Sequence, residues 1–178
     1  IAAEAYARLD NRIAAVCVTT GPGGTNALTG VVGGWLDSIP MFIISGQVRY
    51  DTTARYAMQF TDGLPLRAMG DQEYDIVKMV SHITKYAQMV TDASDIRYCL
   101  EKALYLAKTG RPGPCWLDIP LNVQGAYVET EELLGFDKND YEAGGTGWSV
   151  HGSGCDGCGL CAGKLIQGKP AMIPEDEA

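Results

Sequence analysis

The stretch that decides the fold is residues 16–30, VCVTTGPGGTNALTG. It combines a short apolar run rich in β-branched residues, a glycine-rich turn and the start of a helix. In an open α/β sheet, ligands bind where the carboxyl ends of strands lead into helices. The first turn of a helix also offers unpaired N–H groups and a partial positive charge. This turn is therefore the first place to look for a binding site.

Helices and strands alternate outward from this stretch, from residue 1 to about residue 120. We expect helices over 1–10, 25–35, 74–80 and 92–108. We expect strands over 13–20, 41–46, 83–90 and 114–120. Such alternation predicts an α/β fold: a doubly wound, flavodoxin-like, mostly parallel sheet with helices on both faces.

Three details refine this expectation. The apolar run 13–20 lacks polar alternation, which is typical of a strand covered on both faces. The run 83–90 alternates in part, which places it nearer an edge of the sheet. The helix over 25–35 contains Gly30, Gly33 and Gly34, which are poor helix formers, and we expect them to let the helix approach the sheet closely.

Composition excludes several classes of partner. The 178 residues carry a net charge of −8, which argues against nucleic acid or an anionic membrane as the main partner. No apolar run is long enough for a membrane span and no signal peptide is present, so we expect a cytoplasmic protein. Three cysteines in apolar segments, Cys17, Cys99 and Cys115, are expected to be buried, reduced thiols.

The ends of the chain differ from its middle. The sequence begins at Ile1 without an initiator Met and already in a helical pattern, so we expect an N-terminally truncated domain over residues 1–128. Residues 129–178 form an acidic linker followed by a Gly- and Cys-rich tail, which we expect to be poorly ordered.

The tail contains three cysteines at the spacing of an iron–sulfur or zinc site: Cys155, Cys158 and Cys161. A fourth ligand is needed, and the ferredoxin pattern does not continue after Cys161. His151 is one substitute. The other interpretation is an incomplete or frame-shifted end of the gene with no metal, and we expect no bound metal in this chain.

Common catalytic and nucleotide-binding motifs are absent. The turn GPGGTN fails the dinucleotide fingerprint because its sixth position is Asn26. Neither a P-loop nor a serine-hydrolase elbow occurs. With only His82 and His151, a Ser–His or Cys–His pair has little support. The residues alone therefore indicate an α/β domain whose first strand–helix turn binds a ligand, and they do not identify the chemical class of that ligand.

Several short segments, in order, resemble one family. They are AEAYAR at 3–8, TTGPGGTN at 19–26, DSIPM at 37–41, SGQV at 45–48, GRPGP at 110–114 and LDIPLNVQ at 117–124. Together they resemble the N-terminal pyrimidine-binding domain of thiamine-diphosphate-dependent enzymes, and most of all that of the acetolactate synthase large subunit. The resemblance covers residues 1–128 and does not reach the tail.

The resemblance implies a 2-oxo acid carboligase. Such an enzyme decarboxylates pyruvate on thiamine diphosphate and transfers the two-carbon unit to a second 2-oxo acid. It implies Mg2+, bound by a separate diphosphate domain, and FAD as a further family cofactor. It also implies a homodimer or homotetramer, because the family's site lies between domains of two subunits, and this chain alone is expected to be inactive. The alternatives are another thiamine-diphosphate-dependent decarboxylase or carboligase, or a non-catalytic flavodoxin-like binding or electron-transfer module that uses the Cys-rich tail.

The family's site residues map onto few positions of this sequence. By resemblance, Pro22 and Gly23 lie against the aminopyrimidine, Asn26 contacts the ring region of the cofactor, and Gln72 matches a glutamine near the cofactor. The family's catalytic glutamate is expected just upstream of Ile1, so no catalytic residue is assigned in this chain.

One position departs from the acetolactate synthase pattern. The residue before the family glutamine is usually a Phe that lines the substrate pocket, and here it is Asp71. A carboxylate disfavours an anionic 2-oxo acid unless a cation pairs with it. The other interpretation of Asp71 is a solvated loop residue.

Overall fold

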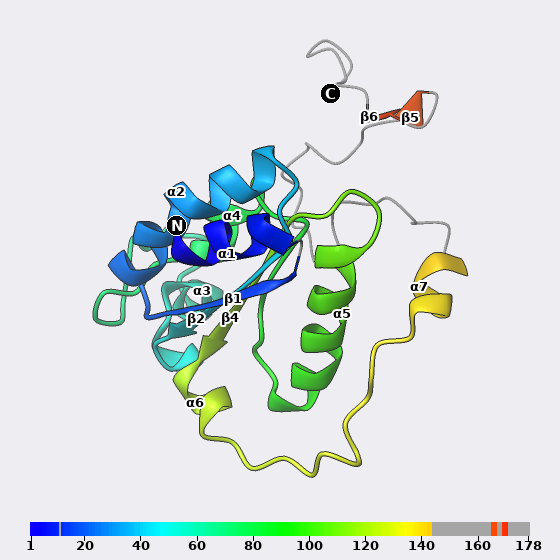
Figure 1. Cartoon of the computed structure of the whole chain (residues 1–178). Coiled ribbons are helices and arrows are strands. Elements are labelled where there is room, and N and C mark those ends of the chain that lie inside the picture. Colours follow the sequence, from blue (N-terminus) through cyan, green and yellow to red (C-terminus); the bar gives the residue numbers. More distant parts are fainter. Residues whose placement is uncertain (11, 144–164, 167–168, 171–178) are drawn as a thin grey trace. The chain divides into compact units, whose positions relative to one another are not determined.

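Four parallel strands form the centre of the first part of the chain. The computed structural model describes residues 1–10, 12–143, 165–166 and 169–170 (Figure 1). The strands are β1 (Ala14–Val18), β2 (Met41–Gln47), β3 (Tyr86–Met89) and β4 (Pro114–Pro120), in the spatial order β1-β2-β4-β3. The expected parallel sheet is confirmed, and β3 lies at an edge as its partial alternation predicted.

Helices cover both faces of this sheet. On one face, α1 (Ala2–Asp10), α2 (Pro22–Leu36) and α4 (Ile76–Val80) pack over a core centred on Ile43 and Trp116. On the other face, α5 (Ile96–Lys108) and α6 (Leu121–Gln124) pack over Phe42, Cys115 and Leu117 (Figure 1). The doubly wound α/β class is therefore confirmed.

The strand β1 is an edge strand, which corrects one expectation. After the buried Ala14, its side chains alternate between exposed and half-buried, and Ala15 and Cys17 are the exposed ones. The prediction of a strand covered on both faces was wrong for β1, and so was the prediction of a buried Cys17. The reason is that α5 packs against β2, β3 and β4, whereas β1 pairs only with β2 among the described strands. Cys99 and Cys115 are buried as predicted.

Helix α2 begins earlier than its propensities suggest. It starts at Pro22 rather than at residue 25, because proline presets the helical φ at the first position and close packing outweighs the weakness of Gly23 and Gly24 as helix formers. A Cβ at Gly24 would lie 3.3 Å from the Ile76 side chain. The residues taken for a turn are thus the first turn of the helix.

The glycines later in α2 serve two different neighbours. A Cβ at Gly34 would lie 2.6 Å from the Met41 sulfur, so Gly34 allows the expected approach to the sheet. Gly30 and Gly33 face α1 instead, where a Cβ would lie 2.6 Å from the backbone nitrogen of Ile1 and 3.9 Å from the side chain of Glu4. The expectation for these two glycines was wrong, because they face the neighbouring helix rather than the sheet.

The connection between β2 and α4 contains three short helical segments. These are η1 (Tyr50–Thr52), α3 (Ala54–Ala57) and η2 (Met58–Phe60). The side chain of Thr53 caps α3 by accepting from the backbone N–H of Tyr56 at 3.2 Å. A further short segment, η3 (Ala93–Asp95), precedes α5, and the Asp92 side chain caps it by accepting from the N–H of Ser94.

The chain divides into two compact units, Ile1–Lys138 and Asn139–Ala178. Helix α7 (Lys138–Ala143) begins at the boundary. In the second unit, β5 (Leu165–Ile166) and β6 (Lys169–Pro170) form an antiparallel pair. The predicted cysteine cluster, Cys155, Cys158 and Cys161, lies outside the described residues, as does His151. No described helix is long and apolar enough to cross a membrane.

Candidate functional site

The candidate site lies where β1 leads into α2, at the carboxyl edge of the sheet. Gly21 has a φ of +55°, a conformation that side chains rarely adopt, and Pro22 follows as the first residue of the helix. A Cβ at Gly21 would lie only 2.1 Å from the carbonyl oxygen of Gln72. Gly21 is therefore needed both for the turn and for the close approach of the Gln72 backbone.

The structure brings the four cofactor-binding candidates to this junction or close to it. Pro22 and Asn26 lie one helical turn apart on the exposed side of α2, and Gly23 is half-buried between them. Gln72 is exposed and has a φ of +54°, which is uncommon for a residue other than glycine. Within the described part of the chain, neither the Asn26 amide nor the Gln72 amide has a hydrogen-bond partner. Both amides are therefore available to a ligand.

A buried hydrogen-bond network lies at the carboxyl ends of β2 and β4. Asp118 is fully buried, and its two carboxylate oxygens accept from Ser45 Oγ at 2.5 Å and from Gln47 Nε2 at 3.0 Å. Gln47 Nε2 also donates to the carbonyl of Tyr74 at 2.9 Å, and Gln47 Oε1 accepts from Thr20 Oγ1 at 2.6 Å. The network thus extends to Thr20, which precedes Gly21, and to Tyr74, which lies two residues after Gln72.

Burial controls the ionisation of Asp118. Loss of hydration raises the pKa of the Asp118 carboxyl to about 6, because desolvation outweighs the hydrogen bonds from Ser45 and Gln47, which lower the pKa. The charge of Asp75 raises the pKa further. The segments SGQV and LDIP contribute to the family resemblance, but no role was predicted for these side chains from the sequence. The available signal was a polar residue at the end of each of two apolar strands.

A second buried carboxylate fixes the connection between β2 and α4. Glu73 is buried and accepts from the backbone N–H of Ala54 at 2.9 Å and of Met69 at 2.7 Å. These bonds hold both ends of residues 54–69 beside Gln72. Sequence reasoning also missed Glu73, which directly follows Gln72.

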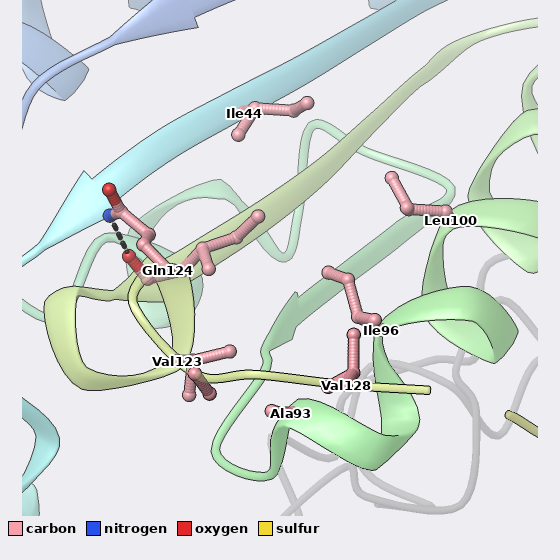
Figure 2. A pocket seen from close by; sticks show the side chains of 9 residues that line it. Ile44, Ala93, Ile96, Leu100, Val123, Gln124 and Val128 are labelled. Atoms are coloured by element: carbon pink, nitrogen blue, oxygen red, sulfur yellow. Dashed lines mark hydrogen bonds between the residues drawn. The ribbon is translucent and has the colours of Figure 1, made fainter. Parts of the chain in front are cut away.

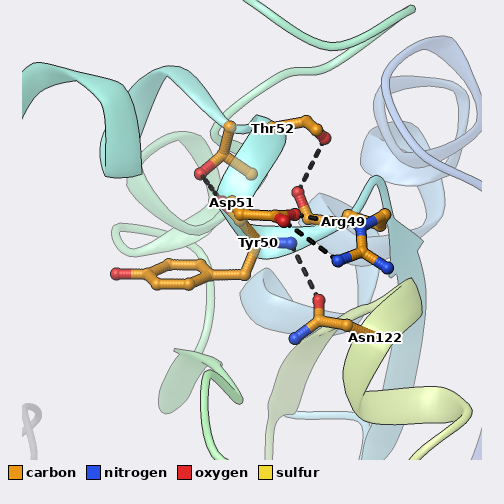
Figure 3. Close-up of polar contacts among 6 residues, drawn as sticks. Arg49, Tyr50, Asp51, Thr52 and Asn122 are labelled. Atoms are coloured by element: carbon orange, nitrogen blue, oxygen red, sulfur yellow. Dashed lines mark hydrogen bonds and ion pairs between the residues drawn. The ribbon is translucent and has the colours of Figure 1, made fainter.

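The start of the same connection is tied to α6. Figure 3 shows Asn122 Oδ1 accepting from the backbone N–H of Tyr50 at 2.8 Å, and Arg49 paired with Asp51 at 2.9 Å. The hydrogen bond from Arg49 lowers the pKa of the exposed Asp51 carboxyl. The connection is therefore attached to the sheet domain at both of its ends.

Asp71, the candidate for the substrate pocket, is exposed beside Gln72. No described cation forms an ion pair with it. The condition under which a carboxylate would suit an anionic substrate, a paired cation from this chain, is thus not met by the described residues.

A separate apolar groove of about 420 Å³ lies on the face of the sheet that α5 and α6 cover (Figure 2). Side chains from β2, α5 and the segment after α6 line it, among them Ile44, Leu100 and Val128. Its polar side chain, Gln124, donates its amide to the carbonyl of Ile119 at 2.7 Å. The groove offers no charged group, so it does not suit a charged cofactor. Among the described residues, no three His, Cys, Asp or Glu side chains are grouped to hold a metal ion.

Curated relatives of this chain carry the name acetolactate synthase. The large subunit from Lactococcus lactis is 38% identical over 121 residues, which are 68% of this chain and 19% of the relative. The large subunit from Haemophilus influenzae is 41% identical over 118 residues, 66% of this chain and 18% of the relative. Acetolactate synthase 2, chloroplastic, from Zea mays is 38% identical over 126 residues, 69% of this chain and 17% of the relative.

A family match covers the candidate site in part. Residues 1–66 match the family described as thiamine pyrophosphate enzyme, N-terminal TPP binding domain, a range that includes β1, the start of α2 and β2. The relatives extend the similarity to about two thirds of the chain, while the chain spans less than a fifth of their length. This chain therefore carries, over residues 1–66, a segment of the N-terminal TPP binding domain of the thiamine pyrophosphate enzymes.

Proposed function

We propose that this chain supplies the pyrimidine-side wall of a thiamine diphosphate site in an acetolactate synthase-like carboligase. The observation that carries the proposal is the junction at Gly21, where two exposed amides, of Asn26 and Gln72, have no partner among the described residues. An aminopyrimidine ring needs a flat apolar contact and a few hydrogen-bonding groups, and Pro22 with these two amides offers that combination.

The residues of this chain would bind and orient the ring. Pro22 would contact a face of the pyrimidine, and Gly23 would allow the helix backbone to approach it. Asn26 and Gln72 would hydrogen-bond the ring edge and fix its rotation. When bound, thiamine diphosphate supplies the electron sink for decarboxylation of a 2-oxo acid. The residues of this chain would contribute the position and orientation of the pyrimidine ring.

The rest of the site would come from outside the described residues. No described group of carboxylates suits Mg2+ and the diphosphate, and the relatives are more than five times as long as the matched segment. We therefore propose that a diphosphate-binding domain and Mg2+ complete the site, in a dimer or tetramer of the whole protein. On the same reasoning, this chain alone would not turn over pyruvate.

Asp71 favours a second candidate within the family. It is exposed next to Gln72 and has no described cationic partner. A carboxylate at that place would repel the carboxylate of a second 2-oxo acid. The second candidate is therefore a thiamine-diphosphate-dependent decarboxylase, or a carboligase with an uncharged acceptor.

Binding of thiamine diphosphate to the 15N-labelled 178-residue chain tests the proposal. We expect its addition to shift the amide resonances of Gly23, Asn26 and Gln72 in NMR spectra. Gln72→Ala should weaken binding about two- to twelvefold, because one hydrogen bond to an uncharged group contributes about 0.5–1.5 kcal/mol.

Gln59→Ala is the matched control. Gln59 is also an exposed glutamine, but its amide has a partner within the chain, because it donates to the Tyr50 hydroxyl at 3.5 Å. We expect Gln59→Ala to bind as the unmodified chain does. Resonance shifts confined to the apolar groove near Leu100, or equal losses in the two variants, would count against the pyrimidine site at Gly21.

A further inference from the structure

The carboxylate of Asp118 accepts hydrogen bonds from two side chains of β2, Ser45 and Gln47. Trp116 Nε1 donates to Ser45 Oγ at 2.8 Å, and Ser45 Oγ donates to Asp118 Oδ1. Gln47 Nε2 donates to Asp118 Oδ2. An ionised carboxylate only accepts hydrogen bonds, whereas a protonated one also donates. The arrangement therefore suits the ionised form of Asp118, although burial makes that form costly.

The orientation of Gln47 follows from this arrangement. Because its amino group faces Asp118 and the carbonyl of Tyr74, its Oε1 must face the other way. There it accepts from the hydroxyl of Thr20 at 2.6 Å and from the backbone N–H of Val48 at 3.0 Å. A rotated Gln47 amide would place donors against donors at both ends.

The two ends of the network are the two halves of the candidate site. Thr20 directly precedes Gly21, and Tyr74 lies two residues after Gln72, whose carbonyl Gly21 approaches. We propose that Asp118 is a positioning residue for this site. Its carboxylate orients the Gln47 amide, which in turn binds the Thr20 hydroxyl and the Tyr74 carbonyl. In this way Asp118 fixes the position of the start of α2 relative to the Gln72 segment. Its meaning for a cofactor rests on the proposed function, but the coupling itself is a property of the ligand-free chain.

The proposal predicts that the conformation at Gly21 and at Tyr74 changes when Asp118 gains or loses its charge. Of the elements beside Asp118, β2 presents the uncharged Ser45 and Gln47, and β3 places the uncharged Met89 opposite Asp118 in the sheet. The segment before α4 presents Asp75, whose charge raises the pKa of Asp118 and which pairs with Lys78 at 3.5 Å. Protonation of Asp118 would add a donor where Ser45 and Gln47 already donate, and Gln47 would lose its fixed orientation.

A pH titration of the ligand-free 178-residue chain by NMR tests this. We expect the amide resonance of Gly21 and the carbonyl resonance of Tyr74 to move together, with a midpoint near pH 6, the pKa of Asp118. Asp118→Asn should abolish this transition at both positions. Asp75→Asn should keep it and lower its midpoint, since the charge that raises the pKa of Asp118 is gone.

Two further variants keep the test decisive if Asp118→Asn does not fold. Thr20→Val removes the hydroxyl at one end, so Gly21 should lose the transition while Tyr74 keeps it, and Thr20→Ser should restore it. A change caused by the titration of any other group would persist in Asp118→Asn, whereas a change caused by Asp118 would not.

The positioning role is overturned if Gly21 keeps the same midpoint in Asp118→Asn, or keeps its full response in Thr20→Val. The titration needs no ligand. If thiamine diphosphate fails to bind while the transition is present, the proposed function fails and the coupling stands.

Discussion

At the scale of single residues, the candidate site depends on backbone conformation more than on reactive side chains. Gly21 and Gln72 both have positive φ values. Their backbones lie so close together that a Cβ added to Gly21 would be 2.1 Å from the carbonyl oxygen of Gln72. A residue such as Gln72 in this region costs on the order of 1–2 kcal/mol. Strain of this kind persists where surrounding contacts enforce it, often near functional sites. Here Glu73, with its two backbone hydrogen bonds, supplies such contacts.

Gly21→Ala should therefore destabilise the protein by two separable effects. It would place a Cβ at a φ of +55° and also against the Gln72 carbonyl. We expect a loss of about 3 kcal/mol or more in the free energy of unfolding, since strained backbone alone costs about 1–3 kcal/mol. Gly63→Ala is the control, because Gly63 has a φ of +84° and no atom within 4 Å of an added Cβ. Urea unfolding measures both; equal losses would mean that the contact with Gln72 contributes nothing.

The sequence predicted this junction but not the network beneath it. The turn was recognisable because glycine, proline and a buried strand occur together in one short stretch. Ser45, Gln47 and Asp118 lie 73 positions apart at their extremes, as the Ser45–Asp118 bond shows. Which polar side chains meet depends on the pairing of β2 with β4, and in that register Ser45 lies opposite Asp118. Strand pairing is not readable from one sequence.

At the scale of elements, β1 shows why an apolar pattern alone does not predict coverage. Val16 and Val18 are half-buried against one core, while Ala15 and Cys17 point to the other side and are exposed. Small apolar residues fit either a covered or an open face. The neighbours of the strand decide between them, and α5 packs over the other three strands.

Alkylation of the native protein tests this difference between strands. Iodoacetamide followed by peptide mapping should label Cys17 readily and Cys99 and Cys115 more than about tenfold more slowly, because a buried thiol reacts only after local opening. Burial also raises the pKa of Cys99, and that of Cys115 to about 12, which reduces the reactive thiolate. In denaturant the three should react alike. Protection of Cys17 in the native chain would show that a further segment or partner covers β1.

At the scale of the whole molecule, the first compact unit runs through Lys138. Phe136 packs edge-on against Tyr98 at 5.7 Å and lies 5.4 Å from Tyr105, both on α5. Its backbone N–H also donates to Glu101 at 2.7 Å. The boundary after residue 128, drawn from the acidic composition and the end of the family resemblance, stays a prediction. One aromatic residue in a polar run gives no periodic signal, so the sequence could not show that Phe136 packs on α5.

Phe136→Ala tests whether residues 129–138 contribute to the fold of the first unit. The substitution removes two aromatic contacts from a half-buried side chain, so we expect the free energy of unfolding to fall by about 2 kcal/mol. Leu134→Ala is the matched control, because Leu134 is 80% exposed and its loss should change stability by less than about 0.5 kcal/mol. Urea unfolding followed by circular dichroism compares the two. Equal stabilities of both variants and the unmodified chain would mean that this segment only lies on α5, and that the unit's stability resides in the sheet and the helices before it.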